Sequence, residues 1–247
     1  MRPDLLEAQA NIDWPVSHFD SLQVRLGAWM HDNIHVVIKD QPAESPNDVM
    51  VALVKEPLPL ILNVEVGAYL HCLRTALDIL ATALCRRHGA GREDEAYFPI
   101  ARDDAAFAAG TYKGHKFIQR LPDEVRDRIK SLKPYRGGDP YLWALHHLDL
   151  VRKHRQLLTV AISPKSFWIM GPGQINDYVT PVSTGWMRVN DEETVLALVK
   201  KGGPKPEVQF TPRVAFHEPG FGRLPIIHAL RRFAETARAT IEAFDTP

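Results

Sequence analysis

Cysteine and long apolar segments are scarce in this sequence. It holds only two cysteines, Cys72 and Cys85, whose separation of thirteen residues corresponds to about 20 Å along one predicted helix. A disulfide joins Cα atoms less than ~7 Å apart, so these two cannot pair with each other. Residues 1–14 lack a basic stretch followed by an apolar one, and no uninterrupted apolar run approaches the ~18 residues of a membrane span. We therefore expect a reduced, cytoplasmic protein without a membrane partner.

The signatures of nucleotide, hydrolase and zinc chemistry are also missing. The sequence contains no G-x-x-x-x-G-K-[ST], no G-x-G-x-x-G after a strand, no G-x-S-x-G and no H-E-x-x-H. Two cysteines without a C-x-x-C exclude a standard zinc knuckle, and we expect neither a cofactor nor a metal. Net charge is absent too, since 30 Lys and Arg balance 30 Asp and Glu. This balance argues against a broad electrostatic binder of nucleic acid and leaves a local basic patch open.

The strongest pattern that is present lies over residues 65–88. A second strong helix is predicted over 140–158, where Asp139 and Pro140 supply an N-cap and a first helical position. Further helices are predicted over 15–31, 103–110, 122–132 and 225–244. In 65–88, apolar residues recur at alternating four- and three-residue steps, as in a helix with one buried face: Val66, Leu70, Leu73, Leu77, Leu80 and Leu84.

Strand-type runs lie before and after the predicted helical core. Residues 35–39 and 49–55 flank a turn-rich segment and predict a hairpin with a long loop. An antiparallel sheet of about five strands is predicted from the β-type runs 157–162, 167–170, 186–189, 195–199, 208–210 and 214–216. No polar linker separates these parts. The prediction is a single α+β domain over 1–247, a helical bundle with an appended antiparallel β-sheet: helical core about 60–158, β-rich part about 159–217, closing helix about 224–244.

Two of the predicted helices carry polar residues that suggest a site. On the first, Arg74 and Asp78 lie four residues apart and share a face. One interpretation is an intrahelical salt bridge. The other is that the Arg74 guanidinium faces a cleft, where its planar fork suits a phosphate or carboxylate.

The second polar group is HHLDLVRKHR, residues 146–155. His146, Asp149 and Lys153 share one face, and His147 and His154 lie on a neighbouring one. A histidine titrates near neutral pH and could transfer a proton there; the other interpretation is a polar helix face. The ligand-binding candidates are Arg74, Asp78, His147, Asp149, Lys153 and His154, and no residue is assigned a catalytic role.

Basic residues also gather around the turn between the predicted helices 122–132 and 140–158. If these helices form a hairpin, the bases could meet nucleic-acid phosphate. Acidic residues are interleaved with them, so a solvated face is the other interpretation. The bases are Arg126, Arg128, Lys130, Lys133, Arg136, Arg152, Lys153 and Arg155, and the acids are Asp123, Glu124, Asp127 and Asp139.

Four stretches resemble a widespread family of uncharacterised bacterial proteins. They are LRTALDIL (73–80), FPI (98–100), LKPY (132–135) and LWALHHLDLVRKHRQLL (142–158); the family wording is close to LRSALDHL, FPI, LQPY and LWxLHxLDxxDKHRxLL. The helical core of that family is similar in pattern to HEPN-type domains, many of which are metal-independent ribonucleases with an Arg-x(4–6)-His motif. In that motif the arginine holds the scissile phosphate, and the histidine assists the 2′-hydroxyl attack or protonates the leaving group.

The resemblance implies binding more than catalysis. Arg74 matches the motif arginine, but Ile79, Leu80 and Ala81 occupy the positions of the histidine. The leading hypothesis is a HEPN-like, non-catalytic or weakly catalytic module that binds RNA or a protein partner, and a homodimer is compatible with it. The alternative is a small-molecule enzyme or ligand-binding protein with a polar pocket between bundle and sheet. A third hypothesis is a dimerising or defence-associated scaffold.

Overall fold

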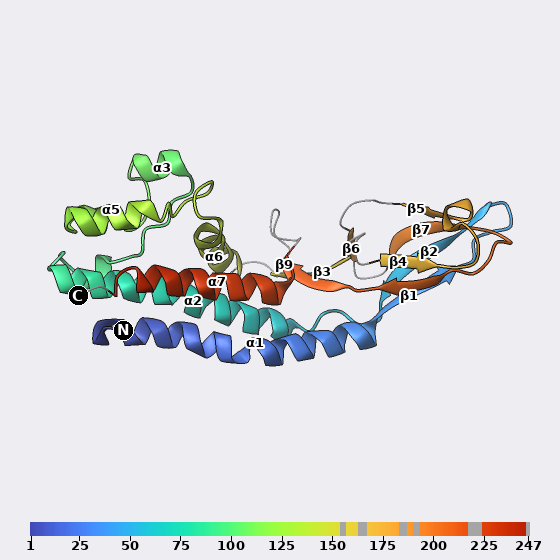
Figure 1. The fold of residues 1–247 in the computed structure, drawn as a ribbon, viewed down its shortest axis with the longest axis horizontal. Helices are drawn as coiled ribbons and strands as arrows, with labels where there is room; N and C mark the ends of the chain where they lie inside the picture. Colours follow the sequence, from blue (N-terminus) through green and yellow to red (C-terminus); the bar gives the residue numbers. More distant parts are fainter. Residues whose placement is uncertain (154–156, 163–166, 183–186, 190–192, 217–223, 246–247) are drawn as a thin grey trace. The chain divides into compact units, whose positions relative to one another are not determined.

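The computed structural model is an α+β protein (Figure 1). It describes residues 1–153, 157–162, 167–182, 187–189, 193–216 and 224–245. Two compact units share the chain. The helical unit comprises residues 1–20, 63–157 and 227–247, and the sheet unit comprises residues 21–62 and 158–226. The sheet unit therefore combines two parts of the chain that are far apart in sequence, the N-terminal hairpin and the C-terminal strands.

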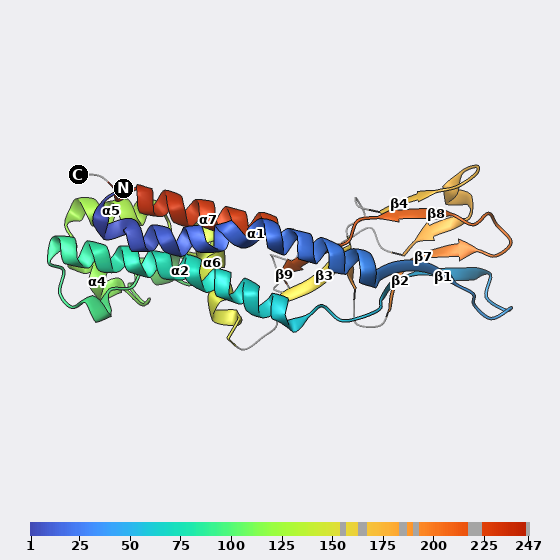
Figure 2. The same ribbon diagram turned by 90° about the horizontal axis from the view of Figure 1, so that it is seen from below.

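Three long helices lie side by side in the helical unit (Figures 1 and 2). They are the first part of α1 (Leu6–Asn33), nearly all of α2 (Leu60–His88) and α7 (Ile226–Glu242). Most of the side chains buried between them are apolar, as the stripe on 65–88 predicts. Ion pairs at the edge join α7 to α1, with Arg238 Nη2 2.9 Å from Asp13 Oδ1. The predicted helix 15–31 is longer than expected, and Pro15 lies inside α1.

Shorter helices complete this unit. They are η1 (Pro3–Leu5), η2 (Glu93–Glu95), α3 (Asp104–Ala108), α4 (His115–Gln119), α5 (Asp123–Ser131) and α6 (Pro140–Val151). One prediction is wrong here: the helix expected to reach residue 158 ends at Val151. Leu158 instead begins a strand, because its β-branched successors favour extended backbone.

The turn between α5 and α6 fixes where α6 begins. Lys133 adopts a left-handed backbone with φ of 48°, and its carbonyl accepts hydrogen bonds from the N–H groups of Tyr135 and Asp139, both at 2.8 Å. A Cβ atom at Gly138 would lie 2.2 Å from that carbonyl oxygen, so only glycine fits. Asp139 then caps α6, as predicted.

The cap should contribute measurably to stability. Asp139 Oδ1 accepts hydrogen bonds from the backbone N–H groups of Tyr141 at 2.9 Å and Leu142 at 2.8 Å. We expect Asp139→Ala to lower the free energy of unfolding by about 1 kcal/mol. Asp123→Ala is the matched control, because that side chain is 85% exposed and makes no cap on α5. Urea titration followed by circular dichroism measures both, and equal losses would contradict the capping role.

The sheet unit contains three antiparallel sheets among its described strands. The first has four strands in the order β1-β2-β7-β5, the second has the order β6-β3-β9, and the third pairs β4 with β8 (Figure 2). The strands are β1 (Ile34–Lys39), β2 (Asn47–Val54), β3 (Leu158–Ile162), β4 (Phe167–Met170), β5 (Val179–Pro181), β6 (Met187–Val189), β7 (Glu193–Lys200), β8 (Glu207–Phe210) and β9 (Arg213–Phe216), with η4 (Ile175–Asp177) before β5.

The predicted hairpin of β1 and β2 is confirmed, with Val37 opposite Val51. The single sheet of about five strands is wrong. β2 pairs with β7 from the C-terminal half, and the register shifts once, between Met50 and Val51. The middle of β2 is buried, so the backbone N–H and C=O groups on the edge that does not face β1 need hydrogen-bond partners. β7 provides them.

By length and composition, α2 is apolar enough to cross a bilayer. Among the described residues it is the one helix that meets both criteria, and 61% of its most apolar 18-residue window is buried inside the protein. Core helices of other proteins pass the same test, so this feature is weak evidence for a membrane span.

Candidate functional site: the contact between α2 and α6

Arg74 lies at the centre of the polar contact between α2 and α6. Its side chain is 8% exposed. Nε donates to Nδ1 of His146 on α6 at 3.2 Å, and Nη2 donates to the backbone carbonyl of Phe98 at 3.1 Å. Nη1 lies 2.8 Å from Asp78 Oδ1, an ion-pair distance without hydrogen-bond geometry. All three nitrogens of this buried guanidinium therefore face internal partners.

Asp78 completes a clamp around Phe98. Its Oδ1 accepts a hydrogen bond from the backbone N–H of Phe98 at 2.9 Å, while Arg74 binds the carbonyl of the same residue. The Phe98 ring is buried, at 1% exposure. The i, i+4 pair on α2 thus satisfies both backbone polar groups of a residue that belongs to no helix or strand, as buried backbone requires.

His146 is held as a neutral imidazole. Burial, with the adjacent Arg74 guanidinium as the next cause, lowers its pKa from 6.5 to about 4, and Asp149 opposes this shift only in part. Because Nδ1 accepts the Arg74 hydrogen bond, the ring proton belongs on Nε2. A histidine in this state cannot serve as a protonated general acid near neutral pH.

A second polar contact lies one turn away on both helices. Asp149 Oδ1 accepts a hydrogen bond from Arg152 Nε at 2.6 Å and lies 3.3 Å from Nδ1 of His71 on α2. The Asp149 side chain is 10% exposed, whereas the His71 side chain is 56% exposed. From the first contact to the second, the chain goes back by one turn on α2, from Arg74 to His71, and forward by one turn on α6, from His146 to Asp149. The polar stripe of α2 therefore runs along α6.

The four stretches that carry the family resemblance meet around these contacts. LRTALDIL supplies Arg74 and Asp78, FPI supplies Phe98, and the α6 stretch supplies His146 and Asp149. LKPY joins them through Pro134, whose carbonyl accepts the Ala101 N–H at 2.9 Å. FPI and the α6 stretch are thus tied to α2 by hydrogen bonds, and LKPY is tied to the residue that follows FPI. This arrangement gives the residues of those stretches a structural role in the helical unit.

The six candidate residues divide into three groups. Arg74, Asp78 and Asp149 lie in the two contacts just described. His147 and Lys153 do not join them: His147 stacks on Trp143, and Lys153 is exposed beyond the end of α6. His154 lies outside the described residues.

His147 belongs to a second feature, which the sequence analysis missed. Its ring and that of Trp143 are stacked, with centroids 4.9 Å apart and planes at 9°. Arg136, from the turn before α6, places its guanidinium carbon 5.4 Å from the Trp143 ring centre. Both rings are partly exposed and Arg136 is exposed. The i, i+4 spacing of Trp143 and His147 was the available signal. We call Arg136, Trp143, His147 and Lys153 the α6 surface.

The basic residues of α5 do not add free charge to this surface. Each pairs with an acid one turn earlier on the same helix: Arg126 with Asp123, Arg128 with Glu124, and Lys130 with Asp127. Arg136 and Lys153, by contrast, form no ion pair with a carboxylate of the described chain. The three bases of α5 are therefore compensated by acids of the same helix, whereas Arg136 and Lys153 are not.

Comparisons with known proteins give no assignment for this site. No protein-family model matches the chain, and searches of curated proteins and of solved structures found no significant match. Within the described residues, no group of three or more His, Cys, Asp or Glu side chains is arranged to hold a metal ion.

Proposed function

We propose that this protein is a non-catalytic RNA-binding module and that its α6 surface contacts single-stranded RNA. The single observation that carries the proposal is the stack of Arg136, Trp143 and His147, in which an exposed guanidinium lies over a pair of partly exposed rings. Unstacked bases bind such surfaces by stacking on aromatic rings and guanidinium planes.

The charge around the stack favours RNA over a protein partner. Arg136 lies over the Trp143 ring, Lys153 is exposed after the end of α6, and neither pairs with a described carboxylate, so both charges are available to phosphate. An apolar protein-docking face would need a contiguous apolar patch, and on α6 the exposed large apolar side chain is Leu150 alone among the described residues. RNA binding of this kind has little sequence preference, because every base has a face that can stack.

The contact between α2 and α6 supports binding without cleavage. A ribonuclease of the HEPN type needs an arginine that can reach the scissile phosphate. Arg74 is buried and its nitrogens are committed to His146, Asp78 and the Phe98 carbonyl. Breaking these contacts to bind phosphate would leave the buried Phe98 carbonyl without a donor and Asp78 without its cation, at a cost of several kcal/mol.

Removing the Trp143 ring should weaken RNA binding. One base–aromatic stack contributes about 1–3 kcal/mol, so we expect Trp143→Ala to raise the dissociation constant for a fluorescein-labelled oligouridine roughly tenfold or more. Trp143→Phe keeps a stacking face and should retain most of the affinity. Fluorescence anisotropy at fixed salt measures the change. The matched control is Trp168→Ala, which removes a 56% exposed tryptophan from β4 of the sheet unit and should leave the affinity unchanged.

Two further readouts complete this test. Lys153→Ala should weaken binding for every RNA sequence and reduce the slope of log affinity against log salt by about one. Incubated oligouridine should stay intact. If wild-type protein does not bind RNA, or if Trp143→Ala and Trp168→Ala behave alike, the RNA proposal is wrong; retention of a protein by the wild-type chain but not by Trp143→Ala would then favour the protein-binding alternative.

A further inference from the structure

A second cluster of aromatic side chains lies next to the turn that supplies Arg136. The rings of Phe107 and Tyr112 are stacked, with centroids 5.0 Å apart and planes at 9°, and the Tyr135 ring lies 5.3 Å from Phe107. His115 meets Tyr112 edge to face at 5.4 Å. We call Phe107, Tyr112, His115 and Tyr135 the Tyr135 cluster. All four residues are partly exposed, so the cluster is accessible to a ligand.

The backbone around the Tyr135 cluster holds its rings in place. The Ala101 N–H donates to the Pro134 carbonyl at 2.9 Å and so ties the segment before α3 to the residue before Tyr135. Gly110 adopts φ of 71°, and a Cβ atom there would lie 2.4 Å from the His115 ring, so the loop after α3 packs closely on that ring. Rings that are fixed before a ligand arrives lose little conformational entropy on binding.

The Tyr135 cluster lies close to the α6 surface. Tyr135 and Arg136 are consecutive residues, so their Cα atoms are about 3.8 Å apart, and the Arg136 guanidinium lies over the Trp143 ring. A Cβ atom at Gly138 would lie 3.0 Å from Cε2 of Tyr135, which places this ring against the turn that leads into α6. Sites for single strands span about 4–16 nucleotides. A strand of such a length is long enough to reach both groups of rings.

Exposed lysines accompany the Tyr135 cluster. The acids nearby are engaged within the protein: Asp103 caps α3 and pairs with Arg102, and Asp104 accepts a hydrogen bond from the Tyr135 hydroxyl. Three lysines within two residues of a cluster member form no ion pair with a described carboxylate: Lys113, Lys116 and Lys133. The cluster thus combines ring faces with cations, the two components of a surface that binds single strands.

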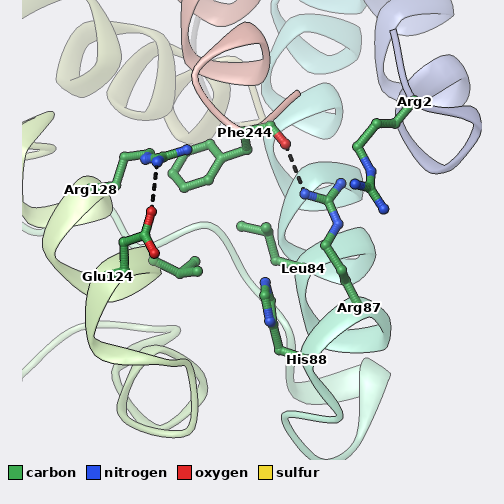
Figure 3. Close-up of a pocket in the computed structure, with 8 residues that line it drawn as sticks. Arg2, Leu84, Arg87, His88, Glu124, Arg128 and Phe244 are labelled. Carbon is green, nitrogen blue, oxygen red and sulfur yellow. Dashed lines mark hydrogen bonds and ion pairs between the residues drawn. The ribbon is translucent and has the colours of Figure 1, made fainter. Parts of the chain in front are cut away.

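The pocket where α2 and α7 end offers a contrast. In this pocket of about 300 Å³, Arg87 Nη1 donates to the Phe244 carbonyl at 2.8 Å, and the Arg128 guanidinium carbon lies 5.8 Å from the Phe244 ring centre (Figure 3). Phe244 is 2% exposed, so a base cannot stack on its ring. The contact between Arg128 and Phe244 is internal to the protein, whereas the rings of the Tyr135 cluster are partly exposed.

We propose that the Tyr135 cluster is a second base-stacking platform for the RNA that binds the α6 surface, and that the ligand is a single strand long enough to occupy both. This inference rests on the proposed RNA-binding function. Bases stack on aromatic rings whatever their sequence. When one strand occupies both platforms, the second contact is intramolecular, and this raises the affinity for long strands above that for short ones.

Fluorescence anisotropy with labelled oligouridines of two and twelve nucleotides tests this inference. Tyr135→Leu removes a stacking face but keeps an apolar side chain, and it should weaken the binding of twelve nucleotides roughly tenfold. The dinucleotide occupies one platform at a time, so the loss of either platform should change its affinity only about twofold. Tyr135→Phe keeps the ring and should retain most of the affinity for both lengths.

Two further variants complete the test, and circular dichroism confirms that each variant is folded. Tyr141→Leu is the matched control: this tyrosine is partly exposed, meets Phe233 edge to face and belongs to neither group of rings, so its loss should leave both affinities unchanged. Lys116→Ala, at an exposed position, should lower the slope of log affinity against log salt by about 0.7 for twelve nucleotides.

The outcomes separate this inference from the proposed function. If Trp143→Ala weakens the binding of twelve nucleotides but Tyr135→Leu and Lys116→Ala do not, the second platform is wrong and the proposed RNA function stands. Equal losses for two and twelve nucleotides in Tyr135→Leu would also overturn the second platform. If the wild-type protein binds neither RNA, both proposals fail.

Discussion

Replacing Arg74 by alanine should lower the free energy of unfolding of the helical unit by about 3–5 kcal/mol. The substitution removes the donor to His146, the donor to the Phe98 carbonyl and the cation beside Asp78 in one step. The Phe98 carbonyl then has no donor, and Asp78 keeps only the hydrogen bond from the Phe98 N–H. Removing one partner from a buried set of polar residues costs more free energy than the complete set contributes to stability, because the remaining partners stay desolvated without their hydrogen bonds.

Urea unfolding followed by helical circular dichroism measures this loss. Arg74→Lys should fall between wild type and alanine, because an ammonium group preserves the charge near Asp78 but lacks the planar fork that reaches three partners. Arg86→Ala on the same helix is the matched control. Its side chain is 62% exposed and pairs with an exposed glutamate, so a change within about 0.5 kcal/mol is expected. Equal losses for Arg74→Ala and Arg86→Ala would show that the buried contact is not structural.

Acid should destabilise the protein through His146. In the folded state its pKa is about 4, against 6.5 in an unperturbed chain. Above pH 6.5 neither state binds a proton at this ring, so the free energy of unfolding is unaffected. Between pH 6.5 and pH 4 the unfolded chain takes up a proton that the folded protein excludes, and stability falls as the pH falls. The loss over this window is about 3 kcal/mol.

His146→Gln isolates this contribution. Glutamine offers an acceptor to Arg74 Nε but has no proton to gain, so the difference in unfolding free energy between wild type and His146→Gln should change by about 3 kcal/mol from pH 7 to pH 4. His147→Gln changes the neighbouring ring, which stacks on Trp143 instead of contacting Arg74, and should retain the acid loss. An identical pH dependence in wild type and His146→Gln would refute the assignment.

The candidate site shows where sequence reasoning succeeds. The spacing of Arg74 and Asp78 places both on one side of α2, and the two residues do form an ion pair. The same helix geometry places Asp149 on one face of α6 with His146, and both face α2. These inferences need only the period of an α-helix, which is a local property.

The partners of those residues required the tertiary structure. Nothing in the spacing of the sequence indicates that Arg74 binds the backbone of Phe98, because that contact depends on where a segment outside any helix or strand crosses α2. His147, and not His146, was among the predicted ligand-binding residues, because helix spacing alone does not show which of two adjacent histidines faces α2. The choice between them depends on the rotation of α6 about its axis, and that rotation is set by packing.

Apolar period, capping and turn chemistry act over a few residues. They were therefore enough to predict the α+β class, the long helix through residues 65–88, the N-cap at Asp139 and the hairpin of β1 and β2. The packed fold was needed to show that this hairpin joins β7, that α6 ends at Val151, and that the polar stripe of α2 is satisfied internally. The physical reason is that backbone edges and buried charges take whichever partner the packed fold brings within hydrogen-bond distance, and that partner can lie anywhere along the chain.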